Sequence, residues 1–169
     1  MVVTLLLQAF AGSLLLAAAE SAGDAPPVTY VTVSEAAVTR ARNDVDRIKS
    51  LVDVGALPRK RLEQAETSLA DAEDEAILVR TLYGSSRIED LSFEDSKLMV
   101  EAAERRVVRQ QAVVDERKRL VDEGILAPAE IQAERQELEM RRGTRDLAQS
   151  RARLLVQLAD MAKAEQELE

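Results

Sequence analysis

The chain has 169 residues, of which 2% are aromatic and 32% charged, and its formal net charge is −8. Thick globular cores usually draw on aromatic rings, so this composition, rich in Ala, Glu, Leu and Arg, indicates long helices and coiled coils. The absence of Cys and His excludes disulfides, thiol nucleophiles, His-based catalysis and nearly every zinc site. The acidic balance argues against nucleic acid as a partner.

The N-terminal segment carries the pattern of a secretory signal. An apolar run from Val2 to Ala18 ends in alanines before Glu20, which supplies the small residues that a signal peptidase reads. The first basic residue is Arg40, so the usual positive start is absent. We predict a signal peptide over 1–19 and a linker over 20–30, which places the rest in the periplasm or outside the cell. The alternative is a retained inner-membrane anchor, at the short limit for a span.

The next segment has the apolar spacing of a coiled-coil seam, with steps of three and four residues. It predicts helices over 34–54, with Ser34 as N-cap, and over 58–83. Between them, Gly55 is expected to end the first helix and Pro58 to begin the second. Folding the chain back at the glycine brings the two apolar series into register as an antiparallel hairpin over 31–84. The predicted seam pairs are Val52–Leu62, Ile48–Ala65, Val45–Leu69 and Ala41–Ala72, and the second series continues to Tyr83.

A second antiparallel hairpin is predicted over 94–169, after a connector over 85–93. Its helices span 94–122 and 128–168, with the turn at Gly124. The fold class is therefore all-α, with two tandem antiparallel coiled-coil hairpins. The second seam is less apolar, and we expect it to pack on the first hairpin, on another copy or on a partner. Its predicted pairs include Val100–Ala152, Ala103–Ala148, Gln110–Arg141, Val114–Leu138 and an ion pair Arg117–Glu134.

The two turns share one sequence pattern. Leu-Val-Asp-x-Gly-x-Leu begins at Leu51 and again at Leu120, a constant offset of 69 residues that also relates Gly55 to Gly124. A shared pattern at equivalent turns indicates an internal duplication.

The first turn resembles the helical hairpin tips of periplasmic efflux adaptor (membrane fusion) proteins. Those tips carry Arg, then Leu, then Ser or Thr; here Arg47 and Leu51 match, and Pro58 stands in the third place. The stretch from Gly55 to Leu69 resembles the family's run into the descending helix. The second tip keeps Leu120 and Gly124, with Glu116 and Ala127 in the other places.

TolC-like outer-membrane efflux proteins have a similar turn and an internal duplication, so the chain resembles them too. Both resemblances cover the turns and adjoining helix ends only. The lipoyl and β-barrel domains of adaptors are absent, and the segment Arg87–Phe93 is too short for the membrane strands of a channel. The resemblance implies that a helical partner contacts the tips, through Arg47, Leu51, Gly55, Pro58, Leu120 and Gly124. The alternative is that Leu51 closes the hairpin and Arg47 is solvated.

Three charged clusters have structural explanations. Asp71, Glu73, Asp74 and Glu75 radiate around one helix without a glycine turn, so we expect a solvated face rather than a calcium loop. Arg105, Arg106 and Arg109 form one basic patch, and Arg141, Arg142 and Arg145 form another. We expect these to pair with Glu104, Asp115, Glu137 and Glu139, the alternative being an anionic polymer or lipid head group.

We therefore expect no enzyme, no cofactor and no metal site, because no nucleophile–base pair or concave site is evident. The predicted function is that of an exported coiled-coil interaction or scaffold protein in an efflux or envelope assembly. The expected partner is a helical envelope protein or a second copy of the chain. Two alternatives stay open: a membrane-anchored periplasmic spacer, and a noncatalytic regulator of a cell-wall enzyme.

Overall fold

A computed structural model describes residues 30–84, 88 and 91–168, and over these residues the fold is helical with no strand. Four long helices follow one another: α1 (Tyr30–Asp53), α2 (Arg59–Leu78), α3 (Phe93–Asp122) and α4 (Gln132–Leu168). A π-helical turn, η1 (Val79–Tyr83), extends α2, and a 3-10 turn, η3 (Pro128–Ile131), precedes α4. The all-α class is thus confirmed. The predicted signal peptide and nearly all of the linker lie outside the described residues.

Helix α1 buries one stripe and exposes the rest. Its half-buried side chains recur at the predicted spacing, and they include Val38, Ala41, Val45 and Ile48. Ser34 was expected to cap the helix, which is wrong, because α1 already includes Tyr30. The buried Ser34 hydroxyl instead donates to the Val31 carbonyl at 2.8 Å inside the helix.

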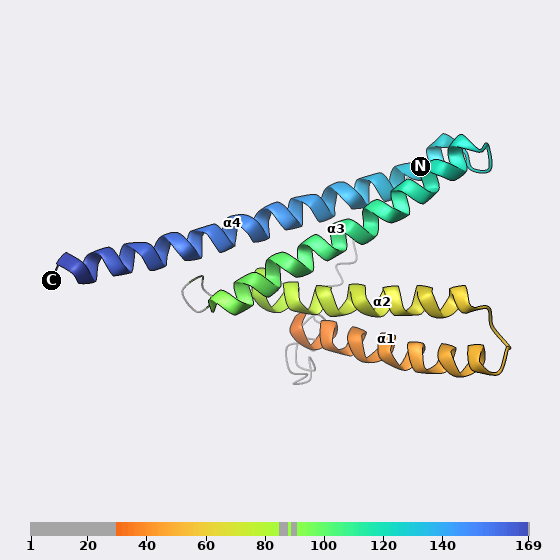
Figure 1. The fold of residues 1–169 in the computed structure, drawn as a ribbon, viewed down its shortest axis with the longest axis horizontal. Helices are drawn as coiled ribbons and strands as arrows, with labels where there is room; N and C mark the ends of the chain where they lie inside the picture. The colour runs from red at the N-terminus through yellow and green to blue at the C-terminus, as the bar shows by residue number, and fades with distance from the viewer. Residues whose placement is uncertain (1–29, 85–87, 89–90, 169) are drawn as a thin grey trace, which may run out of the picture.

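Helix α1 packs along α2 (Figure 1). The Arg42 guanidinium lies 3.0 Å from a Glu73 carboxylate oxygen, and these two residues adjoin the predicted pair Ala41–Ala72. Ile48 and Ala65 line one groove between the two helices. Ile48 and Ala65 are therefore close to each other, as one of the predicted seam pairs requires.

The end of α2 departs from the predicted period. Leu78 and Leu82 are buried, whereas Tyr83, expected in the seam, is half-exposed, and its hydroxyl lies 3.2 Å from the Thr144 hydroxyl in α4. A π-helical turn adds a residue to the turn and so rotates everything after it. The helix stops at Gly84, where a Cβ would lie 2.8 Å from the Arg80 carbonyl oxygen.

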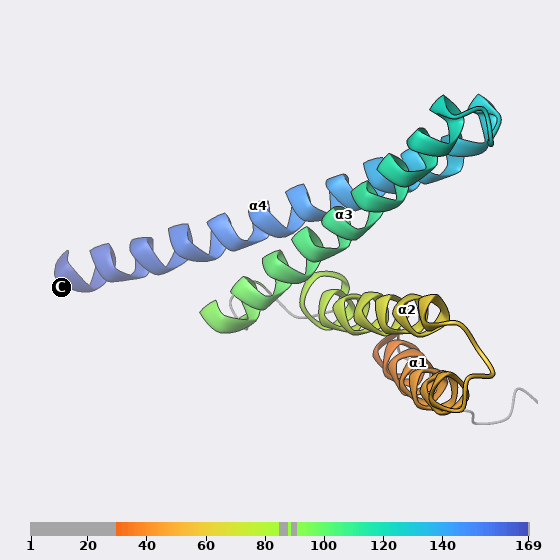
Figure 2. The ribbon, with the colours of Figure 1, turned by 45° about the vertical axis from the view of Figure 1, so that its right-hand side comes forward.

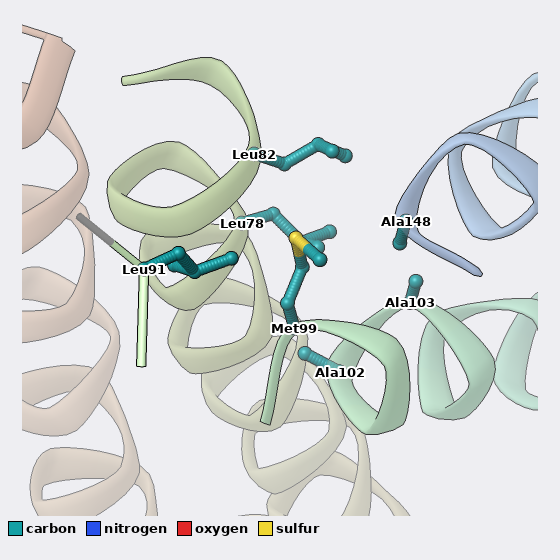
Figure 3. Packing of buried hydrophobic residues seen from close by; sticks show 7 residues of the cluster. All are labelled: Leu78, Leu82, Leu91, Met99, Ala102, Ala103 and Ala148. Atoms are coloured by element: carbon teal, nitrogen blue, oxygen red, sulfur yellow. The ribbon is translucent and has the colours of Figure 1, made fainter. Parts of the chain in front are cut away.

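The main core lies where α2, η1, α3 and α4 meet. Leu78 points toward Met99 of α3, and Leu82 and Leu91 belong to the same cluster (Figure 3). Ala103 and Ala148 face each other between α3 and α4 (Figure 3). Because these side chains are small, the two backbones approach closely.

A second apolar cluster holds α3 and α4 together near their turn. It contains Val114, Ile131 and Leu138, in agreement with the predicted seam. The predicted ion pair is confirmed, with Arg117 Nε 2.8 Å from Glu134 Oε1.

The predicted polar neighbours Gln110 and Arg141 have other partners. Gln110 is buried and donates to the Glu134 carbonyl at 3.1 Å, and Arg141 reaches Asp71 of α2 at 2.8 Å. The two residues line the same cleft, as expected of neighbours in a polar layer. They bind other groups, because a carboxylate of α2 lies close to Arg141 and offers it a charged acceptor.

The helices form two arms that meet near the main core and diverge from it (Figures 1 and 2). One arm contains α1 and α2, and the other contains α3 and α4. The turns at the ends of both arms lie at the same end of the molecule, and α4 continues past the start of α3 at the other end (Figure 1).

Candidate functional site

The turn between α1 and α2 is built around Gly55. Its φ angle is +75°, in the left-handed region that favours glycine. Its backbone N–H donates to the Val52 carbonyl at 2.9 Å, and the N–H of Ala56 donates to the Leu51 carbonyl at 2.8 Å. These two bonds define a Schellman motif, which satisfies carbonyls that the helix end leaves free.

The turn between α3 and α4 repeats this geometry. Gly124 has a φ of +74°, and its N–H donates to the Val121 carbonyl at 3.0 Å. The N–H of Ile125 donates to the Leu120 carbonyl at 2.9 Å. Every bond is shifted by 69 residues from its counterpart in the first turn, so the shared sequence pattern produces one shared backbone structure.

The helix restarts differ in one detail. Pro58 and Ala127 occupy equivalent positions with nearly the same extended backbone, at φ −72° and −74°. The Glu130 carboxylate accepts from the Ala127 N–H at 2.7 Å, a bond that Pro58 cannot make because proline has no N–H. Pro58 therefore sets the chain direction after the first turn, and Glu130 does so after the second.

The predicted contact residues differ in exposure. Arg47 is exposed and pairs with Asp44 at 2.7 Å on its own helix, while Leu51 and Leu120 are half-buried at the two turns. The backbone carbonyl of each leucine accepts two N–H groups of its turn. Gly55, Pro58 and Gly124 are exposed.

Two exposed apolar side chains at the tips were missed. Val54 precedes Gly55 and is 76% exposed, and Ile125 follows Gly124 and is 64% exposed. The signal was present in the sequence, because a Schellman turn places both flanking residues at the outer end of the helix.

The second feature of the site is an ion-pair network between the arms. Asp71 of α2 lies 3.1 Å from Arg109 and 2.8 Å from Arg141. Asp74 of α2 lies 2.6 Å from Arg105 and 2.5 Å from Arg109. A further pair joins Arg106 to Glu75. The network thus joins α2 to both α3 and α4.

Burial makes this network stronger than an ordinary surface cluster. The Asp74 side chain is only 5% exposed. Burial raises the pKa of Asp71, but the Arg106 charge and the bonds and charge from Arg141 and Arg109 outweigh it, so this pKa lies below its ordinary value. The hydrogen bond to Asp74 raises the pKa of Arg105. The ionised forms of Asp71 and Arg105 therefore stabilise the packing of one arm against the other.

Two expectations about these charges need correction. The acidic cluster was expected to be a solvated face, and only Glu73 of its members is exposed. Arg105, Arg106 and Arg109 were expected to pair with Glu104, Asp115, Glu137 and Glu139, but all three bind carboxylates of α2. Arg105 also lies 3.7 Å from Glu101 of its own helix. The periodicity of one helix does not reveal which second helix crosses it. Two of the expected acidic partners do bind the second basic patch: Glu137 lies 2.7 Å from Arg141, and Glu139 lies 2.6 Å from Arg142.

A cleft of about 450 Å³ lies beside the network, between α2 and α3. Its hydroxyl groups are engaged locally: Thr67 donates to the Glu63 carbonyl at 2.8 Å and Ser68 to the Gln64 carbonyl at 3.0 Å. Its arginines Arg106, Arg109 and Arg141 bind carboxylates. This arrangement fixes the two arms and presents no activated nucleophile among the cleft residues.

Within residues 30–84, 88 and 91–168, no cluster of three Asp or Glu side chains is placed to hold a metal ion. Over the same residues, no helix combines the length and the apolar character needed to cross a membrane. Comparisons of the chain with protein-family models, with curated proteins and with solved structures give no match.

Proposed function

We propose that the chain is a noncatalytic interaction protein built as two tandem antiparallel coiled-coil hairpins. The hairpin tips dock on a helical partner protein and hold it at a defined place in an exported assembly. The resemblance of the turns to efflux adaptor tips supports an efflux or envelope assembly as the setting. Export rests on the pattern of residues 1–19.

The observation that carries this proposal is the pair of matching turns at one end of the molecule (Figures 1 and 2). Each turn has the same hydrogen bonds and exposes one branched apolar side chain, Val54 or Ile125. Exposed apolar side chains on a rigid turn suit a groove between the helices of another protein. Two such tips bind more tightly than one when the partner offers two grooves.

The ion-pair network supports the same proposal. A bivalent surface works only when its two halves are held at a spacing that the partner can match. Asp71 and Asp74 join α2 to four arginines of the other arm, which limits hinge motion between the arms. The ion pairs between α2 and the second arm thus help to fix the positions of the two tips.

Site-specific photo-crosslinking tests the proposal in cells that express the full chain. A crosslinking amino acid replaces Val54 or Ile125 at the tips, and Val108, 68% exposed on α3, serves as the matched control. We expect both tip probes to capture the same helical envelope protein and the control to capture none. Equal capture from all three positions, or none from either tip, would contradict the tip proposal.

Export is tested separately by fractionation and N-terminal sequencing of the mature protein. We expect the protein outside the cytoplasm with Glu20 as its first residue. A protein that begins at Met1 and stays with the inner membrane would favour the anchored spacer instead.

A further inference from the structure

The two hairpin tips share a backbone structure but differ in charge. The first turn is followed by three consecutive basic residues, here named the basic cluster: Arg59, Lys60 and Arg61. The equivalent residues 69 positions on, after the second turn, are Pro128, Ala129 and Glu130. Residues 47–61 hold five basic residues and one acidic residue, whereas their counterparts, residues 116–130, hold three basic and four acidic residues. The first tip is therefore basic and the second is weakly acidic.

The fold of the hairpin does not account for the basic cluster. The cluster occupies the first turn of α2, and no acidic residue stands in that turn. Because the N-terminus of a helix carries a partial positive charge, three cations there destabilise α2. The second turn follows the opposite rule, since Glu130 stands in the first turn of η3. Residues that break a local rule without a structural gain are expected at functional sites.

The side chains of the basic cluster face solvent. All three residues are exposed. Among the described residues, no carboxylate forms an ion pair with Arg59, Lys60 or Arg61, and Arg61 donates to the Gln64 side-chain oxygen at 3.4 Å. Successive residues of a helix point about 100° apart, so the three cations cover more than half of the circumference of α2 at the tip.

The basic residues of the second tip are largely neutralised by their own hairpin. Arg117 lies 2.8 Å from Glu134, and Arg119 lies 2.8 Å from Glu116. The hydrogen bond from Arg119 lowers the pKa of Glu116, and the charge of Lys60 adds a smaller effect in the same direction. The second tip thus offers a partner few uncompensated cations, whereas the first tip offers a cluster of them.

We propose that the first tip docks in an acidic groove between helices of the partner protein. Val54, which is 76% exposed, packs on the apolar floor of the groove, and the basic cluster binds carboxylates along its rim. The guanidinium groups of Arg59 and Arg61 suit carboxylates because each can donate two parallel N–H bonds to one of them. This docking rests on the proposed function and adds the chemistry of the partner to it.

The difference in charge also fixes the orientation of the partner. The second tip has no basic cluster, so the groove that receives it needs no acidic rim. Exchanging the two tips would place Glu123 and Glu130 against the carboxylates of the first groove, which is unfavourable. Two tips with one backbone structure therefore bind two grooves that are not interchangeable.

A groove in a protein suits the basic cluster better than an anionic bilayer does. The chain has a net charge of −8, and a flat anionic surface would repel the acidic residues that lie within about 10 Å of it. Within residues 47–61, Val54 is the one large apolar side chain that is exposed, whereas binding in a membrane interface needs a broad apolar face. A groove requires contact with the tip alone.

The first test adds charge reversal to photo-crosslinking from Val54 in cells that express the full chain. The substitutions Arg59→Glu, Lys60→Glu and Arg61→Glu are combined in one variant. We expect the yield of captured partner to fall at least about tenfold, because three attractive contacts become repulsive. The variant should keep its helix content by circular dichroism and melt no lower than the parent, since glutamate suits a helix N-terminus.

The matched control reverses three exposed basic residues far from both tips. Arg40→Glu, Lys97→Glu and Lys163→Glu make the same change in net charge, and all three positions are exposed. We expect this control to capture the partner from Val54 with the yield of the parent chain. A difference between the two triple variants therefore reports the position of the charges and not their number.

The second test identifies the groove and exchanges its charges. Mass spectrometry of the crosslinked peptide shows which partner segment lies against Val54, and we expect aspartates or glutamates on that segment. Replacing these carboxylates with lysines in the partner should lower capture by the parent chain. The same replacement should restore capture by the variant in which the basic cluster is reversed.

The third test asks whether a lipid surface could be the ligand. The purified full chain is sedimented with vesicles of phosphatidylcholine, with and without phosphatidylglycerol. We expect the chain to stay in the supernatant with both kinds of vesicle at physiological salt.

The acidic groove is refuted by unchanged capture after reversal of the basic cluster, or by a crosslinked segment without acidic residues. Binding to phosphatidylglycerol vesicles that the reversal abolishes would also refute it, because the cluster would then recognise lipid. A parent chain that captures no protein from Val54 refutes the proposed function itself, so the two failures are distinguishable.

Discussion

Removing Asp74 tests whether charge holds the two arms together. Asp74→Ala leaves Arg105 and Arg109 without a carboxylate that lies 2.6 and 2.5 Å away. Loss of one partner from a fully buried ion pair costs about 3–5 kcal/mol, because the remaining charge stays desolvated. The cost here falls at the lower end, about 3 kcal/mol, since the Arg105 side chain is 47% exposed and rehydrates, and Arg109 keeps Asp71.

Glu73→Ala is the matched control from the same helix. Glu73 pairs with Arg42 at 3.0 Å, but both side chains are largely exposed. Exposed pairs contribute up to about 1 kcal/mol, so this variant should lose no more than that. Urea unfolding followed by circular dichroism gives both free energies. Equal losses from Asp74→Ala and Glu73→Ala would refute the view that a buried network docks the arms.

The remaining predictions concern the turns and pH. Gly55→Ala and Gly124→Ala should each lower the free energy of unfolding by about 1–2 kcal/mol, because both require a left-handed φ; equal thermal stability to the parent would contradict this. Gly84→Ala should cost about 1–3 kcal/mol by thermal melting, since its Cβ would press on the Arg80 carbonyl. Because the pKa of Asp71 is lowered in the folded chain, acidification protonates this carboxylate in the unfolded chain first. The contribution of Asp71 to the free energy of unfolding should therefore be present above the ordinary pKa of 3.8 and be lost as the pH falls below it. Asp71→Asn should flatten that fall in acid unfolding curves.

Much of the local structure could be predicted from the sequence. The spacing of Val45, Ile48 and Leu69 identified the half-buried stripe of the first helices, because burial follows the helical period. Gly55 and Gly124 marked the turns, since only glycine takes their φ without strain. These features depend on residues near one another in the chain.

The features that were missed depend on residues far apart. The crossing of α2 and α3 changed Asp74 from an expected solvated residue into a buried one. The π-helical turn moved Tyr83 out of the seam and toward Thr144 of α4. The apolar period of a single helix predicts neither the angle between two arms nor a local change of helical phase. The exposure of Val54 and Ile125 could have been predicted from the sequence, because both residues adjoin a predicted turn glycine.

The central claim is that the ion-pair network between the arms holds both turns in one fixed arrangement. The distance between the two tips tests this claim most directly. Spin labels on Val54→Cys and Ile125→Cys report this distance by pulsed electron paramagnetic resonance, and both positions are exposed enough to carry a label. We expect one narrow distribution in the parent chain, and a broad one after Asp71→Asn and Asp74→Asn are added, with helix content unchanged. A broad distribution in the parent, or one that the two added substitutions leave as narrow as before, would contradict the claim.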